Sequence, residues 1–119
     1  MDRKALQQRT KQFHVDVIKL CEQFPRNAAG FETAKQVIRS AGSVGANYRA
    51  TKRAKSVKDF IYKIEIVLEE ADESHYWLEV VKEAGIKNGE EVDRLIEEAN
   101  ELTAIFAATD KTAKANKSQ

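Results

Sequence analysis

Asp72 and His75 have the spacing that comes nearest to a metal-binding motif in this sequence. On a helix they lie one turn apart, as the carboxylate and imidazole do in carboxylate-bridged di-iron bundles. Such a site needs a second pair and two further carboxylates, but the other histidine, His14, follows Lys11 at that spacing. We therefore expect His75 at the edge of a core, and we predict neither a metal site nor a cofactor.

Cys21 is the single cysteine, which excludes an internal disulfide and a cysteine metal cluster. No histidine is placed in the sequence as an obvious base for this thiol. The sequence also contains no glycine-rich phosphate loop, nucleophile elbow or zinc signature. We expect Cys21 to be a buried or half-buried small residue, and we predict that the protein has no catalytic residues and is not an enzyme.

A cluster of basic residues between positions 49 and 63 is the clearest chemical pattern. Asp59 is the single acidic residue in this segment. Cations without acidic partners must face water, an acidic neighbouring subunit or a polyanion. We take six residues as candidates for binding RNA or DNA: Arg49, Lys52, Arg53, Lys55, Lys58 and Lys63.

The formal net charge of +1 hides two oppositely charged halves. Residues 1–63 contain 14 Lys and Arg against 5 Asp and Glu, whereas residues 64–101 contain 3 against 13. In an antiparallel bundle the N-terminus and the C-terminus lie at the same end as the turn near residue 53. The further cations expected at that basic end are Arg3, Lys4, Arg9 and Lys11, together with Lys111, Lys114 and Lys117 of the tail. The sequence thus predicts a strongly dipolar molecule.

Two lines of charged residues run beside the expected apolar stripes. One is basic and includes Lys35 and Arg39, the other is acidic and includes Glu69 and Asp72, and the two could pair with each other. They could pair within one chain, with Lys35 and Arg39 near Glu69, Asp72 and Tyr76, or between neighbouring subunits. Small residues beside the basic line could also let another helix approach closely. The candidate residues for an oligomer interface are Lys35, Arg39, Gly42, Gly45, Ala46, Glu65, Glu69, Asp72 and Tyr76.

Helices must position all of these side chains, because apolar residues recur at helical spacing along the chain. One proline and five glycines leave few turns in 119 residues. Pro25 ends the first helical segment, Ser56 resembles an N-cap of the third, and Gly85 closes it. The sequence predicts an all-α fold: an antiparallel up-down-up-down four-helix bundle over residues 1–108, with a flexible, lysine-containing tail over residues 109–119.

The chain has no apolar run of the roughly 18 to 20 residues that span a bilayer, and its N-terminus does not resemble a signal peptide. We therefore expect a cytoplasmic protein with no membrane partner.

The run VIRSAGSVGANYRATKRAKSVKDFIYKIEIVLEEADESHYWLE, residues 37–79, resembles the signature of the bacterial four-helix-bundle proteins also called 23S rRNA-intervening-sequence proteins. The resemblance extends over about residues 5–108. Ser43, Val44 and Asn47 match its S-V-x-x-N segment, which we interpret as packing and interface positions, whereas Gly45 and the lysine-rich tail depart from the pattern.

This resemblance implies an antiparallel bundle that assembles as a homopentameric ring. It also implies a superfamily shared with the accessory subunit of diversity-generating retroelements, a basic pentameric barrel that binds nucleic acid and a reverse transcriptase. The family offers no catalytic residues. We rank an oligomeric scaffold or accessory protein first, with an unknown protein as client, and binding of RNA or DNA backbone through the basic end as the alternative.

Overall fold

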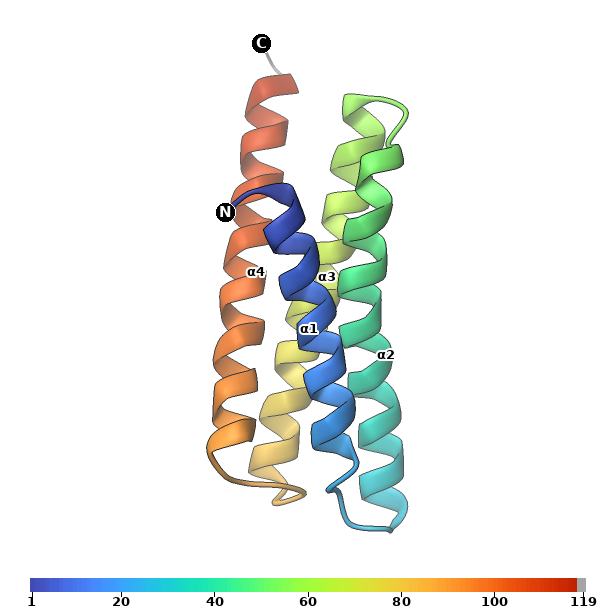
Figure 1. The fold of residues 1–119 in the computed structure, drawn as a ribbon, viewed down its shortest axis with the longest axis vertical. Coiled ribbons are helices and arrows are strands. Elements are labelled where there is room, and N and C mark those ends of the chain that lie inside the picture. The colour runs from blue at the N-terminus through green and yellow to red at the C-terminus, as the bar shows by residue number, and fades with distance from the viewer. Residues whose placement is uncertain (118–119) are drawn as a thin grey trace.

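The computed structural model describes residues 1–117 and contains four α-helices within that range. They are α1 (Arg3–Cys21), α2 (Ala28–Ala50), α3 (Val57–Glu83) and α4 (Glu90–Lys117), with a short 3-10 helix, η1 (Thr51–Arg53), between α2 and α3. Each helix runs antiparallel to the one before it, in a bundle of 51 × 22 × 20 Å (Figure 1). The predicted all-α four-helix bundle is confirmed.

Side-chain caps and glycine set the ends of the helices. The carboxylate of Asp2 and the amide oxygen of Asn27 each accept a hydrogen bond from the backbone N–H three residues further on. Ser56 Oγ accepts one from Asp59 N at 3.0 Å, which confirms the predicted N-cap of α3. Gly85, with φ +68°, ends α3 in the left-handed conformation that favours glycine.

The core is formed by the apolar stripes that the sequence predicts. The stripe of α1 is buried from Leu6 to Leu20, including Thr10, and Phe24 in the turn after α1 is buried as well. The rings of Tyr48 and Phe106 join α2 to α4, with their centroids 5.3 Å apart. The largest fully buried side chains are Phe13, Val17, Leu20, Val37, Val44, Ile64, Val67, Leu78, Val81, Leu95, Leu102 and Phe106.

Residues 109–117 differ from the expected flexible tail, because α4 continues through them to Lys117. Lys114 Nζ lies 2.9 Å from Glu65 Oε2 on α3 and 2.9 Å from Asp110 Oδ2 one turn earlier. These ion pairs give the segment contacts that an apolar periodicity does not report. The rest of the expected tail, residues 118–119, lies outside the described residues.

Helix α1 begins lower along the bundle than the ends of its neighbours, so α2, α3 and α4 alone form the upper end (Figure 1). Its first residue, Arg3, contacts the end of α2. The guanidinium donates to Thr51 Oγ1 at 2.7 Å and to the Tyr48 carbonyl at 3.4 Å, and it lies 5.1 Å from the centroid of the Tyr48 ring. A cation at a helix C-terminus is favourable, so this contact stabilises the end of α2 and ties the start of α1 to it. No helix of residues 1–117 is long and apolar enough to cross a membrane.

Candidate nucleic-acid interface

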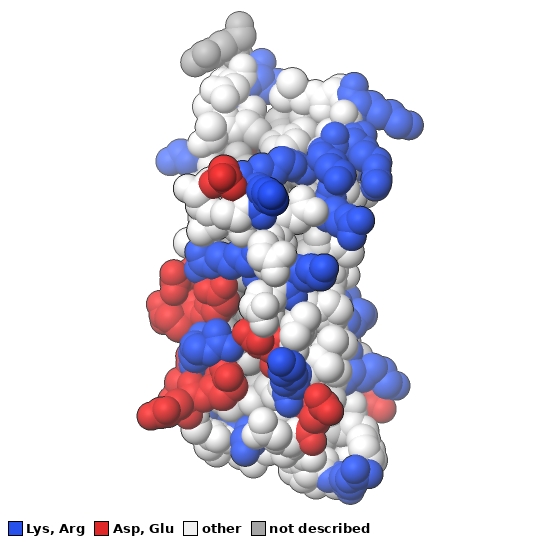
Figure 2. Space-filling view, viewed as in Figure 1, with Lys and Arg blue, Asp and Glu red and all other residues white. Residues whose placement is uncertain are grey.

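Five of the six predicted nucleic-acid-binding residues lie together where α2 passes through η1 into α3. All five are exposed, and none forms an ion pair with another residue of the described chain. Figure 2 shows basic side chains gathered over this end of α2, and acidic side chains lower down over α4. We name this surface the basic corner, which consists of Arg49, Lys52, Arg53, Lys55 and Lys58.

The basic corner has its shape because the chain reverses direction there within a few residues. Thr51 Oγ1 donates to the Tyr48 carbonyl at 2.6 Å, and Ala54 N donates to the Thr51 carbonyl at 3.0 Å, which closes η1. Thr51 is buried, whereas the η1 residues Lys52 and Arg53 are exposed. Because the buried Thr51 anchors η1, the next two residues, Lys52 and Arg53, are exposed to solvent.

Lys63, the sixth predicted residue, is partly neutralised. Its Nζ lies 3.2 Å from Asp59 Oδ1, and Asp59 Oδ2 accepts the backbone N–H of Lys55 at 3.0 Å. These two hydrogen bonds, the one from Lys55 foremost, lower the pKa of Asp59, so its carboxylate stays ionised. Lys63 is half-buried beside it and lies one turn into α3 from the basic corner.

The predicted charged lines pair mostly within the chain, and not with the expected partners. Arg39 Nη1 lies 2.9 Å from Glu70 Oε2, and its Nη2 donates to Glu73. The expected partners, Glu69 and Asp72, are exposed and form no ion pair with residues 1–117. The predicted neighbours of Arg39 were therefore wrong by one position along α3, because a helical wheel does not fix how far α3 is rotated toward α2.

The remaining charges of those lines also find partners nearby. Lys35 pairs with Glu32 of its own helix at 3.7 Å, and Glu65 pairs with Lys114 at 2.9 Å. Tyr76 is 56% exposed, and its ring meets Trp77 edge-on, with centroids 5.1 Å apart. Tyr76 thus lies on the free face of α3 rather than beside Arg39.

The small residues of α2 allow a close approach of α1 in the same chain. A Cβ on Gly42 would lie 2.9 Å from Nε2 of His14, so no larger side chain fits there without displacing the imidazole. A Cβ on Gly45 would lie 3.5 Å from the Thr10 carbonyl oxygen, which is ordinary contact. Ala46, the third small residue, is exposed.

The sequence profile that describes 23S rRNA-intervening sequence proteins matches residues 4–108. The chain belongs to this family. A crystal structure of a protein of unknown function from the S23 ribosomal protein family of Bacteroides thetaiotaomicron is similar to it, with a TM-score of 0.83 and 29% sequence identity, over 93% of this chain and 99% of the other. No curated protein matches the chain significantly.

This member of the 23S rRNA-intervening sequence protein family gathers no group of three potential metal ligands among residues 1–117. Asp72 is exposed, and His75 Nδ1 lies 3.6 Å from Glu79 Oε1 instead. Burial raises the pKa of the Cys21 thiol to about 12, which keeps the sulfur protonated and weakly nucleophilic at neutral pH.

The cations near the N-terminus differ in whether they form ion pairs. Arg9 is held by Glu98 and Glu101 of α4, at 2.6 and 3.2 Å. Lys4 and Lys11 are exposed and form no ion pair within residues 1–117. The sequence predicts all three at the basic end, but only the packing of α1 against α4 shows that Arg9 is paired while Lys4 and Lys11 stay exposed.

Proposed function

We propose that the protein is a non-enzymatic accessory protein that binds the phosphate backbone of nucleic acid through the basic corner. The observation that supports this proposal is that five exposed cations share one reversal of the chain and form no ion pair with the carboxylates of residues 1–117. By contrast, Arg39, Lys63 and Arg9 are paired with carboxylates.

The basic corner suits phosphates better than bases. Lys and Arg neutralise phosphates without regard to sequence, and each contact releases condensed counterions. Of its neighbouring aromatic residues, Tyr48 is buried against Phe106, whereas Tyr62 is exposed. A single exposed ring does not form a platform on which successive bases could stack. Binding is therefore directed to the backbone, weak in sequence preference and sensitive to salt.

Fluorescence anisotropy with labelled structured RNA and labelled duplex DNA tests the proposal. If all five cations contact phosphates of the duplex, log K falls against log salt concentration with a slope of about −4.5. The combined variant Arg49→Glu, Arg53→Glu and Lys58→Glu abolishes binding, because it replaces attraction with repulsion while all three side chains stay exposed.

The matched control reverses three exposed cations at the other end of the bundle: Lys19→Glu, Arg26→Glu and Lys35→Glu. It carries the same change in net charge and keeps most of the affinity. Equal loss in both triple variants would mean that net charge, and not the basic corner, holds the nucleic acid. A parent protein that binds neither RNA nor DNA at low salt would refute the proposal.

A homo-oligomeric scaffold, a pentamer in the first instance, is the second candidate. It is favoured by Glu69, Asp72 and Tyr76, which are exposed at helical spacing on one face of α3. That acidic and aromatic face is complementary to the basic corner of another copy, and a protein client could use it instead.

Sedimentation at low and high salt measures the mass of the species in solution. A large species that dissociates as salt rises supports this use of the charges, and a monomer at every salt concentration contradicts it.

A further inference from the structure

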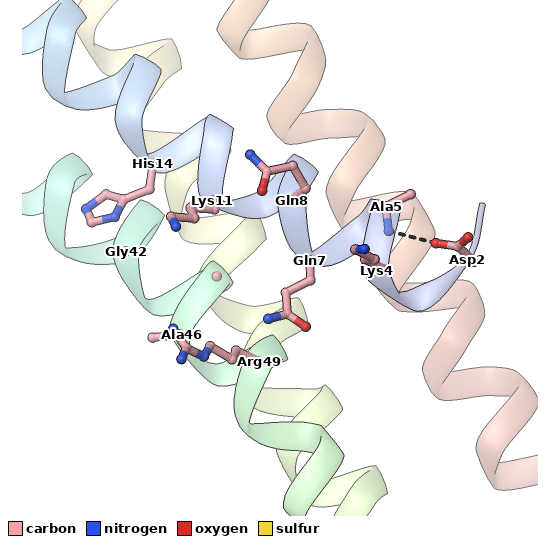
Figure 3. A pocket seen from close by; sticks show the side chains of 11 residues that line it. Asp2, Lys4, Ala5, Gln7, Gln8, Lys11, His14, Gly42, Ala46 and Arg49 are labelled. Carbon is pink, nitrogen blue, oxygen red and sulfur yellow. Dashed lines mark hydrogen bonds between the residues drawn. The ribbon is translucent and has the colours of Figure 1, made fainter.

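The face between α1 and α2 is hollowed into a groove of about 730 Å³. Lys4 and Lys11 line it from α1, and Ala46 and Arg49 line it from α2. In Figure 3, Gln7 extends from α1 toward α2, and the Arg49 side chain lies along α2 toward Ala46. We name this feature the α1–α2 groove.

The charges that line the α1–α2 groove are nearly all positive. Lys4, Lys11 and Arg49 are exposed and have no ion pair within the described chain. Asp2 is the single acidic residue in the lining, and its Oδ1 accepts a hydrogen bond from Ala5 N at 2.7 Å as the cap of α1. The groove therefore attracts anions. Since Arg49 belongs to both surfaces, the α1–α2 groove continues into the basic corner.

The floor of the α1–α2 groove is uncharged and close to the backbone. Gly42, Gly45 and Ala46 form it on the α2 side, and the imidazole of His14 lies over Gly42. The two glycines leave room for His14 and the backbone of α1, and the exposed Ala46 presents only a methyl group to a bound chain, while the cations lie at the edges. The groove thus has a low, uncharged centre between positively charged edges.

We propose that the α1–α2 groove binds a single-stranded segment of nucleic acid. Its phosphates contact Lys4, Lys11 and Arg49, and its sugars and bases lie on the uncharged floor. A duplex keeps its bases inside a rigid cylinder, so it can meet the projecting basic corner but cannot enter a groove between two packed helices. This inference rests on the proposed function and adds that single strands gain contacts that duplexes lack.

The variant Lys4→Gln with Lys11→Gln tests the groove without touching the basic corner. We expect its affinity for a labelled single-stranded oligonucleotide to fall by about tenfold at low salt, and the slope of log K against log salt to fall by about 1.4, since two phosphate contacts are lost. Its affinity for a duplex of the same length stays within about twofold. Lys19→Gln with Arg26→Gln is the matched control, because both cations are exposed, form no ion pair within residues 1–117 and lie outside the groove, and it leaves both affinities unchanged.

Ala46→Leu fills the groove and keeps every charge. Ala46 is exposed, so the bundle accepts the larger side chain, which circular dichroism verifies. We expect weaker binding of the single strand and unchanged binding of the duplex. If Lys4→Gln with Lys11→Gln binds the single strand like the parent, or weakens single strand and duplex equally, the groove inference is wrong while the proposed function stands.

Two other outcomes are separable from these. If Ala46→Leu lowers the mass of the protein in sedimentation, the groove holds a second copy of the chain, and the single-strand proposal is overturned. If the parent binds no nucleic acid of either kind, both the proposed function and this inference fail together.

Discussion

Arg9 of α1 donates two hydrogen bonds to the carboxylate of Glu98 on α4, from Nε at 2.8 Å and from Nη2 at 2.6 Å. Glu101 accepts a third at 3.2 Å, and these bonds raise the pKa of Arg9 further above its ordinary value. A second pair, Arg94 with Asp16 at 2.9 Å, joins the same two helices. The first and last helices are therefore held together at the surface by charge pairs as well as by the core.

Replacing Arg9 with alanine should destabilise the bundle. The change leaves Glu98 half-buried without its bidentate partner, which costs about 1–3 kcal/mol of unfolding free energy. Urea denaturation followed by circular dichroism measures it. Lys19→Ala, exposed on the same helix, is the control and should shift the free energy by less than about 0.5 kcal/mol. A loss of unfolding free energy no larger than that of Lys19→Ala would show that the pair of Arg9 and Glu98 contributes nothing to stability.

Ser40 and Ser74 form a buried polar contact between α2 and α3, with their Oγ atoms 2.9 Å apart. We expect Ser40→Ala and Ser74→Ala each to cost about 1 kcal/mol, because each leaves a buried hydroxyl with one partner fewer. The double variant should cost clearly less than the sum of the two, since no hydroxyl is then left behind. Thermal and urea unfolding of the four proteins measure the cycle, and strictly additive losses would argue against a direct interaction.

Much of the fold can be predicted from local patterns, because the residues of each apolar stripe and each cap lie within one helical segment of the sequence. Ser56 illustrates this: its side chain caps α3 through an N–H only three residues away. The basic corner was predictable for the same reason, since its residues are close in sequence. Contacts between helices were not predictable in this way. The partners of Arg39 depend on the rotation of α3, and the α1–α2 groove depends on the distance at which His14 packs over Gly42.

The end of α4 shows a related limit. No apolar period marks residues 109–117, so the sequence indicated a tail. An ion pair between Lys114 and Glu65 helps to keep the segment helical. The two residues are 49 positions apart in the sequence and meet only once α3 and α4 are packed. Charged residues can extend a helix, but their pairing is a consequence of the fold rather than a local signal.

Cys21 should react slowly with thiol reagents in the folded protein. Burial raises its pKa to about 12, and the thiolate is the reactive form. Because the folded-state pKa lies far above neutrality, the reaction rate at pH 8 should be low and should rise about tenfold per pH unit up to pH 10. Absorbance of the released thiolate from a disulfide reagent measures this rate. The urea-unfolded chain is the control. Equal rates for folded and unfolded protein at pH 8 would mean that the thiol is not shielded.

Lys114→Glu should loosen the end of α4 without unfolding the bundle. In the folded protein, Lys114 Nζ lies 2.9 Å from both Glu65 Oε2 and Asp110 Oδ2, and these hydrogen bonds raise its pKa. A glutamate there would place three carboxylates together, so the last turns should open more often. Phe106, which is fully buried, lies before this segment, so the cooperative melting of the core should change little.

Hydrogen–deuterium exchange measures this loosening peptide by peptide. We expect faster exchange in residues 109–117 of the Lys114→Glu variant and unchanged exchange in α1 and α2. Lys111→Glu is the matched control, because Lys111 lies on the same helix, is exposed and forms no ion pair within residues 1–117. If both variants exchange residues 109–117 at the same rate as the parent, the contact with Glu65 does not hold the end of α4. If both speed exchange equally, added negative charge alone loosens the helix, and Lys114 has no special part in it.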